Sequence, residues 1–384
     1  MRALKFVIFL AYCFAFQSGF GQSQSMIQNQ TERKNDKNTI QLALLLDVSN
    51  SMDGLINQAK TELWSIVNEA STASKNGEST VLEIALYEYG KSSLPKEGGY
   101  MRKVLDFTTD LDTVSKALFG LNTNGGDEYC GQVIHESVEK LIWRDNDSVF
   151  KVIFIAGNEE FTQGTFHYKL ACQNAIKKQI VVNTIHCGDS FVGVRQFWKQ
   201  GAFEGKGRYF YINQNATFVD IDSPYDSLIS LYNDSLNSTY IYYGSKGVDY
   251  KTNQVNQDKN TKTLNKKAYL ERAKSKSKSK AYKNIHWDAV DAYQQDSNVV
   301  SKIYKSGIDQ SIAVKDTGEL KRLILEKSKK RTYYQLQIAK LSDLRNKYIV
   351  EVQSARKSKD MTLGEALASA LRTQASLRGF KFTK

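Results

Sequence analysis

A carboxylate and two hydroxyls occupy alternate positions where an apolar segment of the chain ends. The stretch LLLDVSNSMDG, residues 44–54, contains Asp47, Ser49 and Ser51. Alternate side chains at the end of a strand can meet at one point. One carboxylate and two hydroxyls are hard oxygen ligands, which Mg²⁺ or Mn²⁺ prefers, and the thiols and imidazoles typical of zinc are missing here. The stretch predicts a divalent-cation site, unless both serines only cap the following helix.

The segments around this stretch predict a doubly wound, mostly parallel α/β sheet flanked by helices. Residues 39–48 form an apolar run with a polar end, typical of a strand buried on both faces. Strand and helix patterns then alternate as far as residue 244, with strands expected at 80–90, 101–109, 148–157, 180–188 and 207–214. Such alternation implies parallel strands joined by helical crossovers. Ligands of these sheets bind outside the carboxyl ends of the strands, which is where Asp47 lies.

The motif DVSNSM, residues 47–52, resembles the D-x-S-x-S signature of von Willebrand factor type A (VWA) domains. In that family the motif forms a metal-ion-dependent adhesion site. The resemblance covers about residues 38–244. It implies a VWA/Rossmann-like fold and a cation with one open position, which an acidic side chain of a protein partner fills.

Two further loops of the family complete such a site. One supplies a Thr, and here TNGGDEYCG places Asp127 after two glycines, so the resemblance implies Asp127 as the ligand. The alternative is that Asp127 only favours the start of a helix. The other loop supplies an Asp, and here FIAGNEEF offers Asn158, Glu159 and Glu160. We expect Asn158 and Glu159 to bind the ligand, or else both glutamates to be solvated. The resemblance therefore implies a degenerate adhesion site for Mg²⁺ or another divalent cation.

The N-terminus has the pattern of a cleaved export signal. Basic residues precede the apolar run of residues 6–16, and small residues follow it. We expect a signal peptide at 1–21 and a disordered leader at 22–37, followed by a protein outside the cytoplasm (periplasmic, surface-bound or secreted) with no stable membrane span. Export permits a disulfide between two of Cys130, Cys172 and Cys187, with the pairing left open, or all three are buried thiols.

The charge of the chain is divided between two regions. From Lys246 onward 31 Lys and Arg face 14 Asp and Glu, a net charge of +17, whereas the preceding residues carry −5. We expect a VWA-like domain at 38–245, then at 246–315 a lysine-rich linker with short helices or, alternatively, helix pieces that lie on the first domain, and a helical hairpin at 316–384. In the linker, KSKSKSK is expected to be solvated. Polyanion contact by this basic region is one interpretation and a solvated surface is the other. No nucleic-acid module is recognisable, and export disfavours nucleic acid as a partner.

The sequence favours a binding protein over an enzyme. Phosphate-binding loops, nucleophile elbows and zinc-protease motifs are all missing from it. The first hypothesis is protein–protein interaction or adhesion at the sheet edge through Mg²⁺. The second is a metal-independent envelope scaffold that acts through the basic helical C-terminal region. The third is a hydrolase that uses Glu159 or Glu160 beside a metal.

Overall fold

The computed structural model describes residues 38–213, 221–278, 280–354 and 362–382. The signal peptide and leader expected at 1–37 lie outside these residues. No helix within the described ranges is both long enough and apolar enough to span a bilayer.

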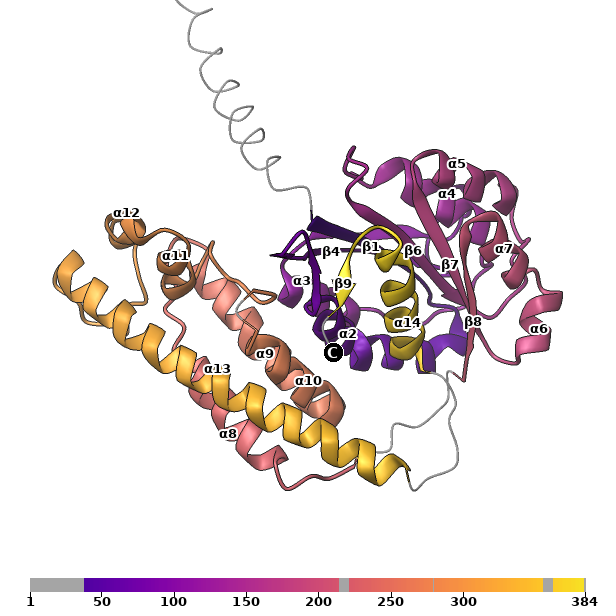
Figure 1. Ribbon diagram of the computed structural model, residues 1–384. Helices are drawn as coiled ribbons and strands as arrows, with labels where there is room; N and C mark the ends of the chain where they lie inside the picture. Colours follow the sequence, from indigo (N-terminus) through magenta and orange to yellow (C-terminus); the bar gives the residue numbers. More distant parts are fainter. Residues whose placement is uncertain (1–37, 214–220, 279, 355–361, 383–384) are drawn as a thin grey trace, which may run out of the picture.

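A six-stranded sheet lies at the centre of the first half of the chain (Figure 1). Its strand order is β5–β4–β1–β6–β7–β8, and β1 pairs in parallel with β4 and β6. Only β5 is antiparallel, because a loop rather than a crossover helix joins it to β4. The predicted doubly wound, mostly parallel fold is therefore confirmed. The bounds are β1 Thr39–Asp47, β4 Val81–Tyr89, β5 Arg102–Thr108, β6 Phe150–Gly157, β7 Ile180–Cys187 and β8 Lys206–Ile212.

Helices cover both faces of this sheet. All nine residues of β1 are buried. Leu44 and Leu46 belong to the apolar cluster that includes α2 and α3, whereas Ala43 and Leu45 belong to the cluster that includes α4, α5 and α7. The continuous apolar run of β1 thus arises because alternate side chains fill two cores. The helices are α2 Asp53–Ala70, α3 Leu111–Phe119, α4 Cys130–Lys140, α5 Tyr168–Lys177, α6 Ser190–Arg195 and α7 Trp198–Glu204.

The end of the chain returns to this sheet. Helix α14 (Leu363–Ser376) packs against α2, β7 and β8 (Figure 1). Strand β9 (Lys381–Phe382) then pairs with β2 (Ala73–Lys75), which also pairs with β3 (Glu78–Ser79) in a second, small sheet. The last helix of the chain is therefore part of the core of the α/β domain.

The helical hairpin expected at 316–384 differs from the structure. Helix α13 (Thr317–Ser354) packs along α8 (Asp226–Asn237) and also touches α10, α11 and α12, whereas α14 packs on the sheet domain. The two long C-terminal helices thus have different partners. Each presents an apolar stripe, and a stripe alone does not identify the surface that it covers.

The segment expected to be a lysine-rich linker is largely helical. It contains α9 Gly247–Leu264, α10 Lys266–Lys276, α11 Ala289–Gln295 and α12 Val300–Lys305. Helix α9 packs against α3, and α10 packs against α2, so both lie on the α/β domain. Within KSKSKSK, Ser275 and Lys276 are fully buried, which corrects the expectation of a solvated charge run.

A buried polar network joins these helices to the sheet domain. The Arg272 guanidinium donates to Asp112 on α3 and to Asp258 on α9, each at 2.6 Å. Lys276 donates to the other oxygen of Asp258 at 2.8 Å. Burial alone would raise the pKa of Asp258, but the charges of Lys276 and Arg272 hold it well below its usual value. Buried ion pairs, rather than a face of apolar side chains, therefore join α9 to its neighbours.

Candidate functional site

The site begins at the carboxyl end of the central strand. Asp47 is the last residue of β1 and is fully buried. Its Oδ1 atom accepts a hydrogen bond of 2.8 Å from the backbone N–H of Ser49, which stabilises the turn into α2. Its Oδ2 atom is also buried and has no hydrogen-bond partner among the described residues. One carboxylate oxygen thus fixes the turn, and the other remains available to a ligand.

Burial changes the protonation of Asp47. Desolvation raises its pKa to about 7, although the nearby polar groups of Ser49 and the backbone N–H of Asn158 oppose this shift. The charge of Glu159 raises the pKa further. In the absence of a cation, this carboxyl group therefore holds a proton up to nearly neutral pH.

A second carboxyl group, which no motif in the sequence indicates, lies beside Asp47. Glu128 is buried, and burial followed by the charges of Asp47 and Glu159 raises its pKa to about 8. A Cβ atom at Gly90 would lie 2.7 Å from Oδ1 of Asp47 and 3.0 Å from Cγ of Glu128, so both side chains border one small space. Gly90 has a φ of +77°, which glycine adopts without strain.

Asp127, the expected ligand of this loop, is exposed. Its carboxylate accepts a hydrogen bond of 3.3 Å from the Tyr129 hydroxyl. The structure thus brings Glu128 rather than Asp127 into electrostatic contact with Asp47. The metal-binding role of Asp127 stays a prediction, and Glu128 becomes the stronger candidate. The sequence signal for Glu128 was only its position next to Asp127 in TNGGDEYCG.

The loop after β6 brings Asn158 to the same place. Its side-chain amide donates to the Ser51 hydroxyl at 3.1 Å, and its Oδ1 atom is buried with no partner among the described residues. Glu159 is exposed, and its backbone carbonyl accepts a hydrogen bond of 2.7 Å from the Trp198 indole. Asn158 therefore belongs to the site through its side chain, and Glu159 contributes charge. Glu160 is exposed.

Close packing fixes the position of Asp47. A Cβ atom at Gly157 would lie 2.5 Å from the Tyr89 hydroxyl and 3.0 Å from Oδ2 of Asp47. The same hydroxyl donates to the Ala156 carbonyl at 2.9 Å. A larger residue at position 157 would displace the carboxylate, so glycine here holds the site open.

These residues fit a hard divalent cation. Asp47 and Asn158 present unpartnered oxygen atoms, Ser49 and Ser51 supply hydroxyls, and Glu128 supplies a second carboxylate. Among the described residues, no group of three His, Cys, Asp or Glu side chains could hold a metal ion. Any cation here would therefore depend on hydroxyl, amide and water oxygens as well as the carboxylates.

The cysteines remain outside the site. Cys130, Cys172 and Cys187 are buried free thiols, so the expected alternative of buried thiols describes this structure. Burial raises the pKa of Cys172 to about 12 and those of the other two well above the usual value. Protonated, buried thiols are poor nucleophiles.

Comparisons with known proteins return structural matches only. No known protein family and no curated protein matches this chain. BatB from Bacteroides thetaiotaomicron is a structural match at 16% identity and a TM-score of 0.35, covering 50% of this chain and 96% of that one. The SpRpn10 VWA domain matches at 16% identity and a TM-score of 0.35, covering 45% of this chain and 87% of that one. Mussel byssus proximal thread matrix protein 1, whose metal site holds zinc, matches at 13% identity and a TM-score of 0.35. The match covers 46% of this chain and 42% of that one.

The motif lies at the centre of the sheet. DVSNSM lies at the carboxyl end of β1, between the parallel neighbours β4 and β6. The structure therefore shows the doubly wound, mostly parallel sheet that the resemblance of the motif implied, with the motif at the carboxyl end of a central strand.

Proposed function

We propose that the sheet edge around Asp47 is a protein-binding site that works through Mg²⁺ or another divalent cation. Asp47, Ser49, Ser51 and Glu128 are the proposed ligands, and Asn158 supports them. Glu128 takes the place that the sequence analysis gave to Asp127. The role is binding or adhesion, without a catalytic step.

The unpartnered Oδ2 atom of Asp47 is the observation that supports this proposal most. Buried polar atoms are almost always hydrogen-bonded, and a buried charge without a partner is costly. A cation beside this atom would stabilise the ionised form of Asp47 and, through it, of Glu128. The raised pKa values of both groups are the expected state of a cation site without its cation.

The partner follows from the coordination chemistry. Mg²⁺ takes six oxygen ligands and usually keeps several waters. A carboxylate of an acidic side chain on the partner protein can replace one of these waters. The second carboxylate, Glu128, lowers the net positive charge of the bound ion. It therefore strengthens cation binding and weakens the attraction for the partner's carboxylate.

The proposed location is outside the cytoplasm, after removal of the signal peptide at residues 1–21. A second candidate function is a metal-independent envelope scaffold that uses the basic helical region. Exposed Leu231 on α8 and Leu336 on α13 favour it, because these helices pack together and exposed apolar side chains can take part in protein contacts. Polyanion contact by the basic surface belongs to the same candidate.

Calorimetric titration of Mg²⁺ and Mn²⁺ into the full chain tests the first proposal. We expect one saturable site, no measurable binding for Asp47→Asn, and at least tenfold weaker binding for Glu128→Gln. The matched control is Asp127→Asn, which changes a neighbouring exposed carboxylate and should alter affinity by less than threefold.

Two outcomes contradict this assignment. If Asp127→Asn weakens binding and Glu128→Gln does not, the ligand is the one that the sequence analysis named. If neither cation binds the wild-type chain, the metal-dependent function is refuted. Partner capture that is equal with and without EDTA would then support the scaffold.

A further inference from the structure

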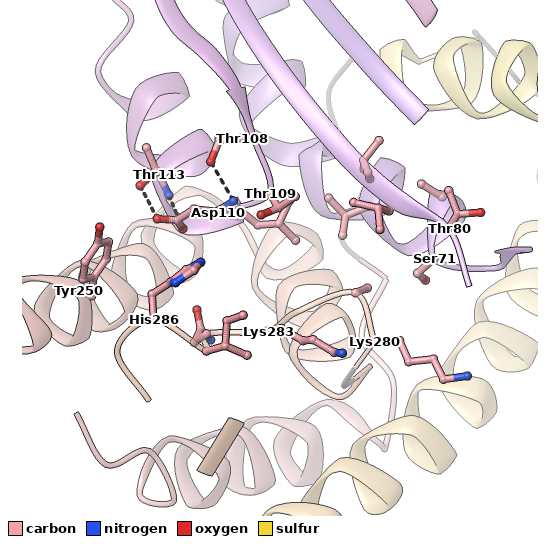
Figure 2. A pocket seen from close by; sticks show the side chains of 18 of the residues that line it. Ser71, Thr80, Thr108, Thr109, Asp110, Thr113, Tyr250, Lys280, Lys283 and His286 are labelled. Atoms are coloured by element: carbon pink, nitrogen blue, oxygen red, sulfur yellow. Dashed lines mark hydrogen bonds between the residues drawn. The ribbon is translucent and has the colours of Figure 1, made fainter. Parts of the chain in front are cut away.

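A cavity of about 570 Å³ lies far from the cation site. It is bordered by the end of α2, the start of β4, the end of β5, the start of α3 and the segment 280–287 (Figure 2). Val81 at its edge pairs with Thr39, whereas Asp47 pairs with Tyr89, so the cavity and the cation site lie at opposite ends of β1. The volume lies within the range typical of sites for small molecules.

We propose that this cavity binds a small amphipathic anion, with an apolar body and a carboxylate or phosphate group. The apolar body has a matching wall, because side chains of two helices, a strand and a loop contribute carbon surface. These residues are Val67, Ala70, Val81, Leu82, Leu111, Ile285 and Trp287.

A buried amide donor belongs to the wall of the same cavity. Asn284 lines it and is only 8% exposed, yet its Nδ2 atom has no hydrogen-bond partner among the described residues. Its backbone is held in place, since its N–H donates to Asp291 at 2.8 Å and its carbonyl accepts from Asp288 at 2.8 Å. A rigid, desolvated N–H donor without an acceptor is what an anionic oxygen of a ligand would complete. The Thr80 hydroxyl, also in the lining, is a second buried group without a partner.

The charges at the cavity favour an anion over a cation. Lys280, Lys283 and His286 all come from the segment that faces Thr80 and Thr109 across the cavity (Figure 2). The one acidic side chain among the lining residues, Asp110, is already engaged. Its Oδ1 atom accepts from the backbone N–H groups at the start of α3, and its Oδ2 atom accepts from a Thr hydroxyl at 2.7 Å. The carboxylate therefore caps the helix, and the lysines remain for the ligand.

The walls of the cavity are anchored independently of any ligand. Lys278 donates to the Asn68 carbonyl at 3.0 Å and to the Ser71 hydroxyl at 2.7 Å, which ties the lysine-rich segment to α2. At the other end, the Trp287 carbonyl accepts from the backbone N–H of Tyr243 at 2.8 Å. Because both ends are fixed, the segment cannot readily collapse into the cavity.

Binding of four octyl compounds to the full chain tests this proposal, measured by calorimetry and by the change in tryptophan fluorescence. Octanoate and octyl phosphate carry the two anionic groups, octanol is the neutral control, and octyltrimethylammonium is the cationic control. We expect saturable binding of at least one anion at a single site, with both controls at least tenfold weaker. The tighter of the two anions identifies the head group.

Three variants locate the site. Asn284→Asp keeps the side-chain shape, removes the donor and adds a charge that repels anions, so it should weaken anion binding at least tenfold. Lys283→Glu lies on the surface, leaves the fold intact and should weaken binding at least threefold. The matched control is Asn298→Asp at an exposed position, which should stay within twofold.

Three results would overturn the proposal. They are the lack of saturable binding for both anions, octanol binding as tightly as the better anion, and unchanged anion binding in Lys283→Glu. Circular dichroism checks that Asn284→Asp is folded, and the surface variant decides the question if it is not.

Discussion

Replacing Arg272 by Met tests whether the buried polar network holds the helical region against the sheet domain. The Arg272 side chain is almost fully buried and donates to Asp112 and Asp258 at 2.6 Å and to the Gln254 carbonyl at 3.0 Å. Its guanidinium also lies 4.6 Å from the centroid of the Trp64 ring. Methionine keeps an apolar stem of similar length and removes the charge.

The expected loss of stability follows from the partners that remain. Removal of one member of a buried ion pair typically costs about 3–5 kcal/mol, because the other charge is left unpaired. Asp258 keeps Lys276 as a partner at 2.8 Å, and Asp112 keeps the Tyr282 hydroxyl at 2.5 Å. We therefore expect Arg272→Met to lower the free energy of unfolding by about 3 kcal/mol, near the lower limit of this range.

Urea unfolding, followed by circular dichroism and tryptophan fluorescence, measures this loss. The matched control is Arg372→Met, which removes an arginine that pairs with Glu69 while its own side chain is 54% exposed. An exposed pair contributes about 1 kcal/mol or less. The double variant Arg272→Met/Asp112→Asn should regain about 1 kcal/mol, because it removes one of the carboxylates left without its arginine.

The reasoning is refuted if Arg272→Met costs no more than Arg372→Met. In that case the buried network would contribute little, and apolar contacts alone would hold α9 and α10 on the sheet domain. A double variant less stable than Arg272→Met would show that the unpaired carboxylate is not the source of the loss.

Three further predictions concern stability. Burial lowers the pKa of His186 to about 4, so the unfolded chain takes up a proton at this residue near pH 6.5, before the folded protein does. Between pH 6.5 and 4 wild type should therefore lose about 3 kcal/mol relative to His186→Gln in urea unfolding; equal pH profiles of the two proteins would contradict this. Gly131→Ala should cost about 3 kcal/mol or more and lower the melting temperature, since its Cβ would lie 2.0 Å from the Phe166 carbonyl oxygen. Thr362→Ala removes the capping box of α14, and calorimetry should show a loss of about 1 kcal/mol.

The main sheet could be predicted because its strands carry strong local signals. The strand at residues 39–47 contains an unbroken apolar run at residues 42–46, and helix patterns separate most of the strands that follow. The small sheet could not be predicted in this way. Its strands have two or three residues, and the pair Ser74 and Lys381 lies 307 positions apart in the chain. Pairing over that distance depends on where α14 docks, which no local pattern encodes.

Helix α9 could not be distinguished from a linker by its sequence, for a different reason. Prediction of a helix from sequence depends on an apolar stripe, but the buried residues of α9 include Gln254, Gln257, Asp258 and Thr261. The partners of Gln257 and Asp258 lie on α3 and α10, and Gln254 donates to Tyr282 in the segment after α10, so only the assembled fold shows that these three side chains are satisfied. The polar, lysine-rich sequence is therefore equally compatible with a solvated linker and with a buried helix.

At the candidate site, the sequence located the loops but could not choose among neighbouring residues. Asp47 and the two serines follow a strand whose end is well defined, so their positions could be predicted. Asp127 and Glu128 lie in a segment between two helices that has no periodic pattern. Which of the two faces inward depends on loop geometry, including the positive φ of Gly90, and this lies beyond pattern recognition.

The return of the final helix to the sheet makes the α/β domain discontinuous along the chain. During synthesis the strands of the main sheet leave the ribosome long before residues 363–382, which cover part of them. Until then, the surface that α14 occupies remains exposed to water. Truncation before residue 363 would therefore leave an uncovered apolar face on a nearly finished domain, which is a starting point for aggregation. Completion of the fold must wait until residues 363–382 have been translated.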